Sequence, residues 1–243
     1  MVKKNDFVEM DFTARVRETN AVFDTTLLDE AEKAGLLHDA SEKSKFMPLG
    51  ICIGQGMLLP GLDKALEGKE LGKWHEVEIS PKEAFGERDT KLVKVIPLKI
   101  FREKGIMPMQ GMMLNLDGML VRIASVSSGR VITDFNNPLA GRAVVYRFRV
   151  NKAIEDAAEK LKILAGFLLG KAENVRIENG KGIIEFFVKV PEAIEKEFAK
   201  KVKEIMGIDV EIKVSEVKKE HNEEKPAEKK EGIVDEKEKQ KSG

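Results

Sequence analysis

The chain has 243 residues, of which 42% are hydrophobic and 35% are charged, a composition that allows well-packed cores and more than one domain. Lys plus Arg and Asp plus Glu number 42 each, so no net charge is present to attract nucleic acid or an anionic membrane. The single cysteine, Cys52, excludes an intrachain disulfide and is typical of a reducing compartment. Without an apolar signal run or a span of ~20 apolar residues, we expect a cytoplasmic protein that does not enter a membrane.

The first part of the chain predicts strands with one short excursion. Residues 7–16 alternate between apolar and polar side chains, which is typical of a half-buried strand. Residues 22–26 indicate a return strand, and residues 27–38 indicate a short helical excursion. Strands are expected again over 45–54 and 73–80.

The most informative segment is residues 54–68, with the sequence GQGMLLPGLDKALEG. Pro60-Gly61 indicates a turn, and four leucines, Leu58, Leu59, Leu62 and Leu66, recur at short helical spacing. A helix of about two turns is not stable alone in water, so this one must pack against a sheet or line a pocket. No nucleophile with partners and no metal-ligand cluster lies nearby. Any chemistry of this segment therefore depends on shape and apolar surface.

Residues 88–135 differ from the preceding segments in composition, because they are rich in methionine. Strand-like runs over 92–96 and 120–126 flank a methionine-rich tract, and a further strand is expected over 131–135. Half of the chain's ten methionines lie in this tract: Met107, Met109, Met112, Met113 and Met119. Asn136-Asn137-Pro138 then predicts a turn, and a strand follows over 144–150.

From Ile154 the periodicity becomes that of an amphipathic helix ending at Gly170. Strands over 175–178 and 183–190 are joined by a hairpin turn at 179–182. Pro191 opens a second helix, and a strand over 210–214 completes an αββαβ unit. The inward face of the second helix is predicted to hold Ile194, Phe198, Val202 and Ile205. From Lys218 onward, Lys and Glu without apolar periodicity predict a disordered tail.

A series of short motifs keeps the same order over residues 1–153 as in FK506-binding-type (FKBP) peptidyl-prolyl cis-trans isomerases, which the chain resembles. They are Asp11-Phe12-Thr13, Val22-Phe23-Asp24, Gly54 to Gly68, Leu71-Gly72-Lys73, Ile79-Ser80-Pro81, Ala84-Phe85-Gly86 and Asn137-Pro138-Leu139-Ala140-Gly141. More narrowly, the chain is similar to SlyD-like and long archaeal members, which carry an insert in the flap. The resemblance implies an α+β fold, in which a bent antiparallel FKBP sheet wraps the short helix, with an inserted small β-rich flap domain. The C-terminal αββαβ domain resembles the extra domain of the long forms.

The expected division of the chain follows from the motifs and the change in periodicity. Residues 1–87 plus 136–153 form a discontinuous isomerase domain, and residues 88–135 form an insert-in-flap domain that binds client chains. Residues 154–217 form the αββαβ domain, and residues 218–243 form the charged tail. Because a short sheet of this kind leaves an edge to be covered, we expect a homodimer through residues 155–217.

Carried over by position, the resemblance assigns residues to the pocket. The implied catalytic lining is Phe12, Phe23, Asp24, Leu58, Leu59, Leu62, Phe85 and Tyr146, with the Leu59 N–H holding a client carbonyl. Leu49 is an implied substrate-binding residue, and the methionine tract is expected to bind clients, since thioethers adapt to many apolar shapes. Four positions depart from the best-known members, which have tyrosine at Phe12 and Phe85, tryptophan at Leu62 and phenylalanine at Leu49.

The resemblance implies a peptidyl-prolyl cis-trans isomerase with chaperone activity, whose partners are unfolded or partly folded proteins with X-Pro bonds. No cofactor or metal is implied, because His38, His75 and His221 lack neighbours at ligand spacing. Other interpretations stay open at this point. The chain could be a non-catalytic holdase, Phe12 and Phe23 could be ordinary core residues, and Asp24 could only start a turn. The methionines could form the core of the insert or a self-association face.

Overall fold

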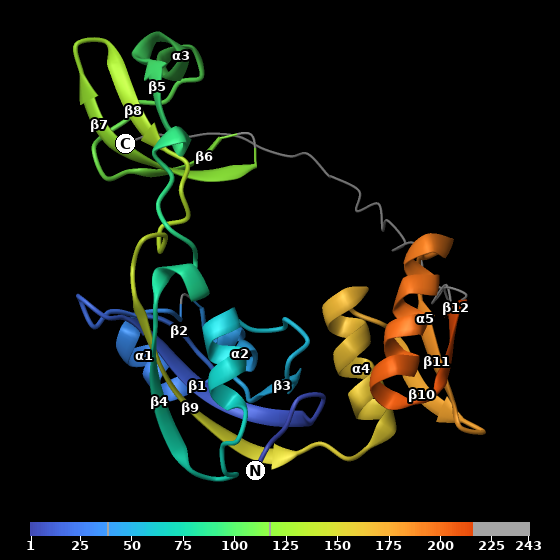
Figure 1. Ribbon diagram of the computed structural model, residues 1–243. Coiled ribbons are helices and arrows are strands. Elements are labelled where there is room, and N and C mark those ends of the chain that lie inside the picture. The colour runs from blue at the N-terminus through green and yellow to red at the C-terminus, as the bar shows by residue number, and fades with distance from the viewer. Residues whose placement is uncertain (38, 117, 216–243) are drawn as a thin grey trace, which may run out of the picture.

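The computed structural model describes residues 1–37, 39–116 and 118–215. These residues form three sheets, each the centre of one unit of the molecule (Figure 1). The architecture is α+β, with antiparallel sheets and an inserted unit, as predicted. His38, His221 and the predicted tail at 218–243 lie outside the described residues.

The first sheet is formed by strands from both ends of the discontinuous isomerase unit. It contains β1 (Phe7–Val16), β2 (Val22–Thr25), β3 (Leu49–Cys52), β4 (Trp74–Ile79) and β9 (Val144–Ala153). The order is β2-β1-β9-β4, β3 also pairs with β1, and every pair is antiparallel. The chain leaves this sheet after β4, forms the inserted unit, and returns as β9, which lies between β1 and β4.

The short helix α2 (Pro60–Leu66) packs against this sheet, as the apolar spacing predicts. Pro60 stands in the first turn, where its missing N–H costs nothing. Leu62 and Leu66 are buried, and a Cβ on Gly61 would lie only 2.4 Å from Cγ2 of Ile79. A glycine at this position lets the helix approach the end of β4. After β2 the chain forms α1 (Leu28–Ala34) and the 3₁₀ helix η1 (Ala40–Lys45).

The inserted unit is a four-stranded antiparallel sheet with one small helix. Its strands are β5 (Val93–Pro97), β6 (Met113–Leu116), β7 (Met119–Ser127) and β8 (Arg130–Asp134), in the order β5-β8-β7-β6. Helix α3 (Leu98–Glu103) places Phe101 against Ile123 and Val131 in the core. The sequence prediction missed α3 and β6, because each is too short to show a period of its own.

Two chain segments, one before β5 and one after β8, join the insert to the first unit, and hydrogen bonds connect the two segments. The Asn136 side chain is buried between them and accepts from the N–H of Asp89 (2.8 Å). Its amide group donates to the carbonyl of Asp89 (2.9 Å) and to the carboxylate of Asp134 (2.7 Å). Arg88 forms an ion pair with the same carboxylate. The connection is therefore a cross-linked pair of segments.

The C-terminal unit has the predicted αββαβ order. It contains α4 (Ala157–Leu168), β10 (Asn174–Glu178), β11 (Lys181–Phe186), α5 (Glu192–Met206) and β12 (Asp209–Val214). Asn179 and Gly180 both have positive φ between the paired residues Glu178 and Lys181, the two-residue hairpin turn expected here. Strands β11 and β12 are parallel, so α5 is the crossover that this pairing requires.

Two details of this unit differ from the prediction. Strand β11 ends at Phe186 instead of continuing to residue 190, and Phe187 and Val188 are 51% and 71% exposed. On α5, Phe198 and Val202 are buried as expected, but Ile194 is 45% exposed. The apolar run after Phe186 therefore forms surface instead of sheet.

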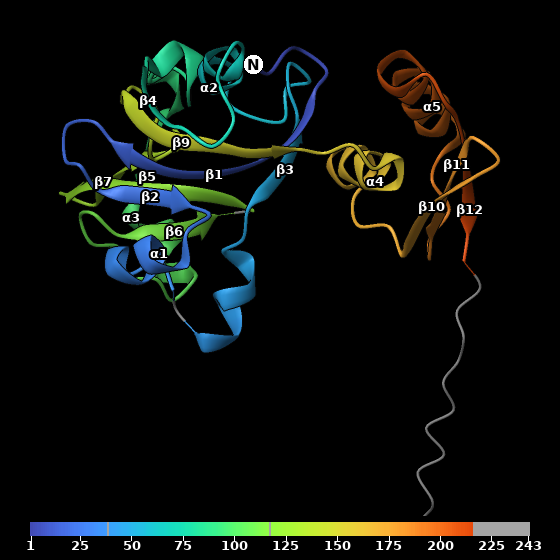
Figure 2. The same ribbon diagram turned by 90° about the horizontal axis from the view of Figure 1, so that it is seen from below.

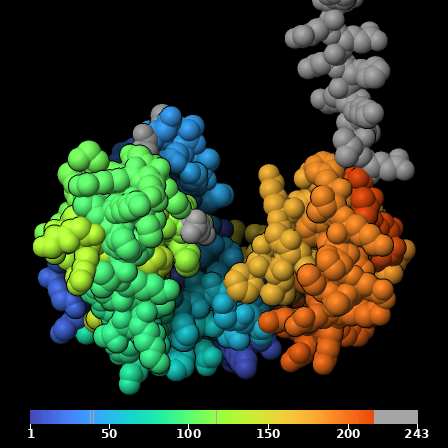
Figure 3. Space-filling model, turned by 90° about the horizontal axis from the view of Figure 1, so that it is seen from above, coloured from blue at the N-terminus to red at the C-terminus, as the bar shows by residue number. Residues whose placement is uncertain are grey.

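Figure 1 shows the insert set apart from the first unit, and Figures 2 and 3 show the C-terminal unit as a separate lobe beside it. Helix α4 contacts β3, and the core of the C-terminal unit includes Phe7 and Cys52 of the first sheet. Within the described ranges, no helix combines the length and apolar character needed to cross a membrane.

Candidate active site

An aromatic cluster lies on the face of the first sheet that α2 covers. Ring centroids of Phe12 and Tyr146 are 5.6 Å apart, and Phe23 lies 5.6 Å from Phe85 and 6.1 Å from Tyr146, edge to face in both cases. Strand pleating places Phe12 and Ala14 on one face, and Ala14 pairs with Tyr146 across β1 and β9. The structure thus brings together all four aromatic residues of the predicted lining.

A β-bulge in the β1–β2 pair determines how Phe23 and Asp24 are presented. Ala14 pairs with Asp24, while Arg15 pairs with Val22, so Phe23 is the extra residue of β2. Bulges redirect side chains next to functional sites, and here Phe23 reaches both Phe85 and Tyr146. Because Ala14 also pairs with Tyr146 on its other side, the small alanine separates Asp24 from Tyr146.

Hydrogen bonds of two threonines fix the backbone behind Phe12. The Thr25 hydroxyl donates to the Phe12 carbonyl (2.8 Å), and the Phe12 N–H donates to the Thr26 hydroxyl (2.9 Å). Thr26 in turn donates to Asp11 (3.1 Å), a buried carboxylate that also accepts from Arg149 and Asn151. Since every partner is buried or half-buried, this network holds the pocket wall rigidly.

The segment before α2 supplies the third wall. Leu58 and Leu59 are half-buried against the same core, and Leu62 is fully buried beneath them. The carbonyl of Leu59 accepts from the N–H groups of Leu62 and Asp63 at 3.0 Å each, whereas the Leu59 N–H has no partner among the described residues. A free donor beside an apolar wall is suited to bind a peptide carbonyl.

Phe85 is held at the other rim by a compact turn. The 3₁₀ helix η2 (Pro81–Glu83) precedes it, and the Pro81 carbonyl accepts from the N–H groups of Ala84 (3.1 Å) and Gly86 (2.8 Å). The Gly86 carbonyl accepts from the N–H of Gly141 (2.8 Å). Phe85 therefore keeps its place at the rim but offers no hydroxyl.

Leu49 is the predicted lining residue that lies apart. It is 38% exposed on β3, opposite Met10, and it is not among the side chains packed on the core of the first unit. Four partly buried residues outside the predicted lining, Met57, Ala65, Val77 and Ala84, do pack on that core. Met57 adjoins the leucine pair in the sequence, so its proximity could have been inferred.

Comparison with known proteins agrees with this geometry. Residues 1–99 match the family described as FKBP-type peptidyl-prolyl cis-trans isomerase, and residues 94–139 match the one described as FKBP26, IF domain. A short-type peptidyl-prolyl cis-trans isomerase of Methanocaldococcus jannaschii is 30% identical over 150 residues, which cover 62% of this chain and 92% of that protein. The chain belongs to the FKBP-type peptidyl-prolyl cis-trans isomerases.

SlyD proteins give further similarity to this FKBP-type chain. SlyD of Helicobacter pylori is 33% identical over 107 residues, covering 42% of this chain and 57% of that protein. SlyD of Escherichia coli K12 is 34% identical over 131 residues, covering 52% and 64%. The family predicted from the motif series is confirmed.

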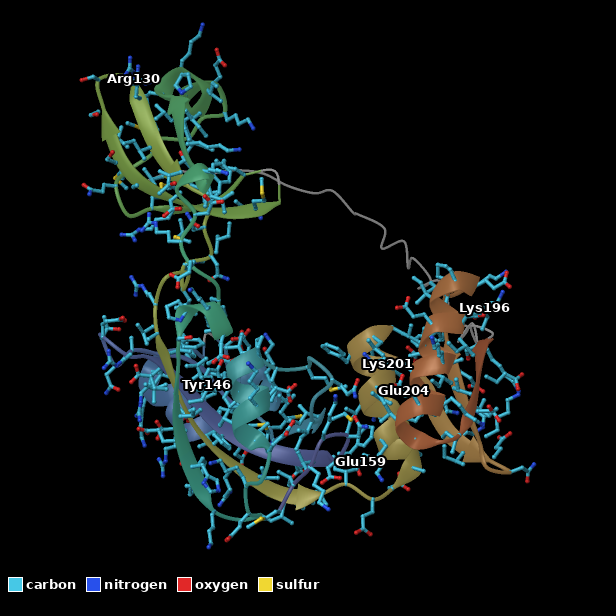
Figure 4. The ribbon with its side chains drawn as sticks, in the orientation of Figure 1. Arg130, Tyr146, Glu159, Lys196, Lys201 and Glu204 are labelled. Atoms are coloured by element: carbon cyan, nitrogen blue, oxygen red, sulfur yellow. The ribbon has the colours of Figure 1, made fainter. Side chains whose placement is uncertain are left out.

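The FKBP pocket contains one carboxylate, that of Asp24. Apolar neighbours remove enough water to raise the pKa of Asp24, although its side chain stays open to solvent on one side and accepts from the backbone of Thr25. Burial, with a smaller effect of the Asp24 charge, raises the pKa of the Tyr146 hydroxyl. Tyr146 therefore stays protonated and can donate a hydrogen bond within the pocket (Figure 4).

The methionine tract divides into surface and core within the insert. Met107, Met109, Met113 and Met119 are exposed, and the first two are 83% and 67% exposed, whereas Met112 packs on the core. Val95, Ile100 and Leu120 add exposed apolar area that the sequence did not single out. A cavity of about 120 Å³ opens among these elements. It is lined by Ile96, Ile100, Phe101, Lys104, Leu116, Met119 and Phe135.

No metal centre is found in the described ranges, which contain no group of three potential ligand side chains. His75 packs on Phe148, with ring centroids 5.7 Å apart, and its buried Nε2 has no hydrogen-bond partner there. Trp74, on the opposite face of β4, lies between the guanidinium groups of Arg147 and Arg149. Trp74 therefore packs against side chains of the neighbouring strand β9.

Proposed function

We propose that the aromatic pocket accelerates cis-trans isomerisation of X-Pro bonds in protein chains. The observation that carries this proposal is the cluster of four aromatic side chains on the core against which Leu59 packs, with a Leu59 N–H that has no partner in the described part of the chain. The proline ring would lie among Phe12, Phe23, Phe85 and Tyr146. The Leu59 N–H would bind a client carbonyl.

The physical basis is differential binding of the twisted state. The barrier to rotation, ~18–20 kcal/mol, comes from amide resonance. Twisting removes that resonance and lowers the charge separation, so an apolar groove favours the twisted state over the planar one. A thousandfold acceleration requires only ~4 kcal/mol of such preference. No nucleophile or cofactor is needed for this step.

Asp24 acts by its charge in this proposal. No proton moves during rotation about the X-Pro bond, so the carboxylate is not a general acid or base. It lies at the edge of the aromatic cluster, separated from Tyr146 by Ala14. A fixed negative charge on one side of the groove would favour one direction of twist, because the carbonyl dipole turns during rotation.

NMR exchange spectroscopy on a short X-Pro peptide tests the proposal. The wild-type protein should accelerate exchange, and Phe23→Glu should reduce that acceleration by more than tenfold, because an ionised side chain brings water into the groove. Val95→Glu, a matched charge on the exposed surface of the insert, should leave exchange unchanged. No acceleration by the wild-type protein would favour the non-catalytic holdase.

We further propose that the insert holds unfolded clients, so that the protein also works as a chaperone. Support comes from the exposed methionines of the insert, of which Met119 lines the 120 Å³ cavity, because flexible thioethers adapt to varied apolar segments. Held clients would reach the pocket at an effective concentration near the millimolar range for a short tether. Capture and rotation then take place on different units.

Replacing Met107, Met109 and Met119 together by serine tests this second role. Catalysed refolding of a proline-limited protein should fall about tenfold, while exchange in a short peptide stays at the wild-type rate. Replacing the same residues by leucine, which keeps apolar area, should retain most of the refolding activity. Unchanged refolding in the serine variant would contradict client binding at this surface.

We also propose a homodimer through residues 155–217, in the cytoplasm. The sheet order β10-β11-β12 leaves outer edges on β10 and β12 among the described residues, where the prediction had expected one. Exposed Phe167, Phe187 and Val214 add apolar area to this unit. Sedimentation that shows only a monomer at high micromolar concentration would contradict the dimer.

A further inference from the structure

The cores of the isomerase unit and the C-terminal unit meet at one end of the first sheet. Phe7 and Cys52 lie directly opposite each other on β1 and β3, and both are buried in the core of the C-terminal unit. Their neighbours Val8 and Ile51 are buried in the core of the isomerase unit. This end of the sheet is therefore covered on both faces, by the core of the isomerase unit on one and by the core of the C-terminal unit, whose helix α4 contacts β3, on the other.

Met57 is the side chain that packs against both cores. Its sulfur accepts a hydrogen bond from the Cys52 N–H at 3.2 Å, so the loop after β3 folds back onto its own start. Gly54 and Gly56 have φ of +76° and +70°, conformations that allow this reversal. The next residue after Met57 is Leu58, the first leucine of the pocket wall.

Other contacts tie the loop at its ends. The Gly54 N–H donates to the Asp63 carboxylate (2.8 Å) in the first turn of α2, and the Gln55 side chain donates to Asn5 (2.7 Å). From Gly56 to Leu58, the bond to the Met57 sulfur is the only hydrogen bond that ties the loop to another of the described residues. Packing holds this stretch, with Leu58 against the core of the isomerase unit and Met57 against both cores.

We propose that the C-terminal unit braces the catalytic loop, and that Met57 is the positioning residue that transmits its support. With Met57 fixed, Leu58 and the free N–H of Leu59 keep their distance from the aromatic cluster. A displacement of about 1 Å at a catalytic group can cost on the order of a hundredfold in rate. The proposal rests on the isomerase function proposed above. It predicts that support from the C-terminal unit affects the turnover even of a peptide too short to contact that unit.

The test uses the full-length protein and a short X-Pro peptide. Met57→Ala removes the contact with both cores, and Met57→Leu keeps an apolar side chain of similar volume. Ile163→Ala is the matched control, because Ile163 lies on the same interface, with Cδ1 2.9 Å from the position of a Cβ on Gly50 in β3. It removes one apolar contact between α4 and β3 and leaves Met57 and the rest of the shared core unchanged.

Met57→Ala should lower kcat/KM for the peptide about tenfold, and Met57→Leu should stay within about twofold of the wild type. Ile163→Ala should also stay within about twofold, even where urea unfolding shows that it is as destabilised as Met57→Ala. In amide NMR spectra, the Leu58 and Leu59 signals should shift in Met57→Ala and not in Ile163→Ala.

Equal losses in Met57→Ala and Ile163→Ala would overturn the proposal, since that result indicates a general effect of stability. Wild-type kcat/KM in Met57→Ala would overturn it as well. If Met57→Ala does not fold, Met57→Val takes its place, with an expected loss of about threefold and the same contradicting outcomes. Absence of turnover in the wild-type protein would instead defeat the isomerase function itself.

Discussion

In the isomerase pocket, Phe12 and Tyr146 are 6% and 5% exposed, and the backbone of Phe12 is hydrogen-bonded to Thr25 and Thr26. In the insert, by contrast, four methionine side chains are exposed to solvent, and one of them, Met119, lines a small cavity. Both regions bind apolar groups in the proposed function. One holds its side chains in a single arrangement, and the other leaves them free to adapt.

The difference follows from what each region has to recognise. The pocket must distinguish a twisted imide from a planar one, a small change in shape and polarity, so its walls cannot yield. In the proposed chaperone role, the insert accepts many segments with no common shape, so it needs flexible side chains with little packing of their own. Under that proposal, a rigid and an adaptable apolar surface on one chain would support catalysis and capture separately.

The largest effect is expected at the helix that supports the pocket. Gly61→Ala places a Cβ 2.4 Å from Cγ2 of Ile79, which must push α2 away from the sheet. We expect the free energy of unfolding to fall by about 1–3 kcal/mol and peptide isomerisation to fall with it. Urea unfolding and NMR exchange measure the two effects.

Gly166→Ala is the matched control for this change. Gly166 lies in α4 with nothing within 4 Å of an added Cβ, so alanine should stabilise the helix by up to about 1 kcal/mol. Wild-type stability and turnover in Gly61→Ala would show that the pocket is as adaptable as the insert, and the comparison would fail.

A smaller effect on turnover is expected at the connection between the two regions. Asn136→Ala leaves the N–H and carbonyl of Asp89 and the carboxylate of Asp134 without this partner, at a cost of about 1–3 kcal/mol. Because the connection then loosens, catalysed refolding should fall severalfold while short-peptide exchange stays constant. Asn137→Ala, an exposed neighbour, is the control. Equal losses in both assays would show that Asn136 supports the pocket itself.

The longer helices and strands could be predicted from the sequence because each contains several repeats of its apolar spacing. The ten-residue strand β1 and helices α4 and α5 have the expected positions, and the Asn179-Gly180 turn needs only two residues to be recognised. Helix α3 and strand β6 were missed, since six and four residues show no period.

The residues of the site could be predicted only in part from the sequence. The resemblance named the four aromatic residues, and the structure brings them together. Leu49 lies apart, because its place on the edge of β3 depends on how β1 and β3 pair. The contact of Met57 with two cores was beyond prediction, since it depends on the docking of α4, a long-range event that no local pattern records.

The smallest expected effect is the pH dependence of turnover and stability, which compares a carboxylate of the pocket with one at the connection to the insert. The pKa of Asp24 is raised because its surroundings are partly desolvated, so its charge is lost on acidification before that of an ordinary aspartate. At Asp134, burial alone would raise the pKa, but hydrogen bonds from Asn136 and the charge of Arg88 outweigh it and lower the pKa. The pocket charge therefore disappears at a higher pH than the charge of the connection.

We accordingly expect kcat/KM for a short peptide to fall by about twofold to fivefold as pH drops from 7 through the raised pKa of Asp24. Asp24→Asn should show the lower rate at every pH, with no such step. The ionised Asp134 stabilises the native state above its unfolded pKa, and that stability is lost only as pH falls through its lowered folded pKa. As pH falls, kcat/KM should therefore decrease at a higher pH than the free energy of unfolding does. Urea unfolding and NMR exchange in the same buffers measure the two quantities. A wild-type profile identical to that of Asp24→Asn would mean that the pocket works by shape alone, with no contribution from its single carboxylate.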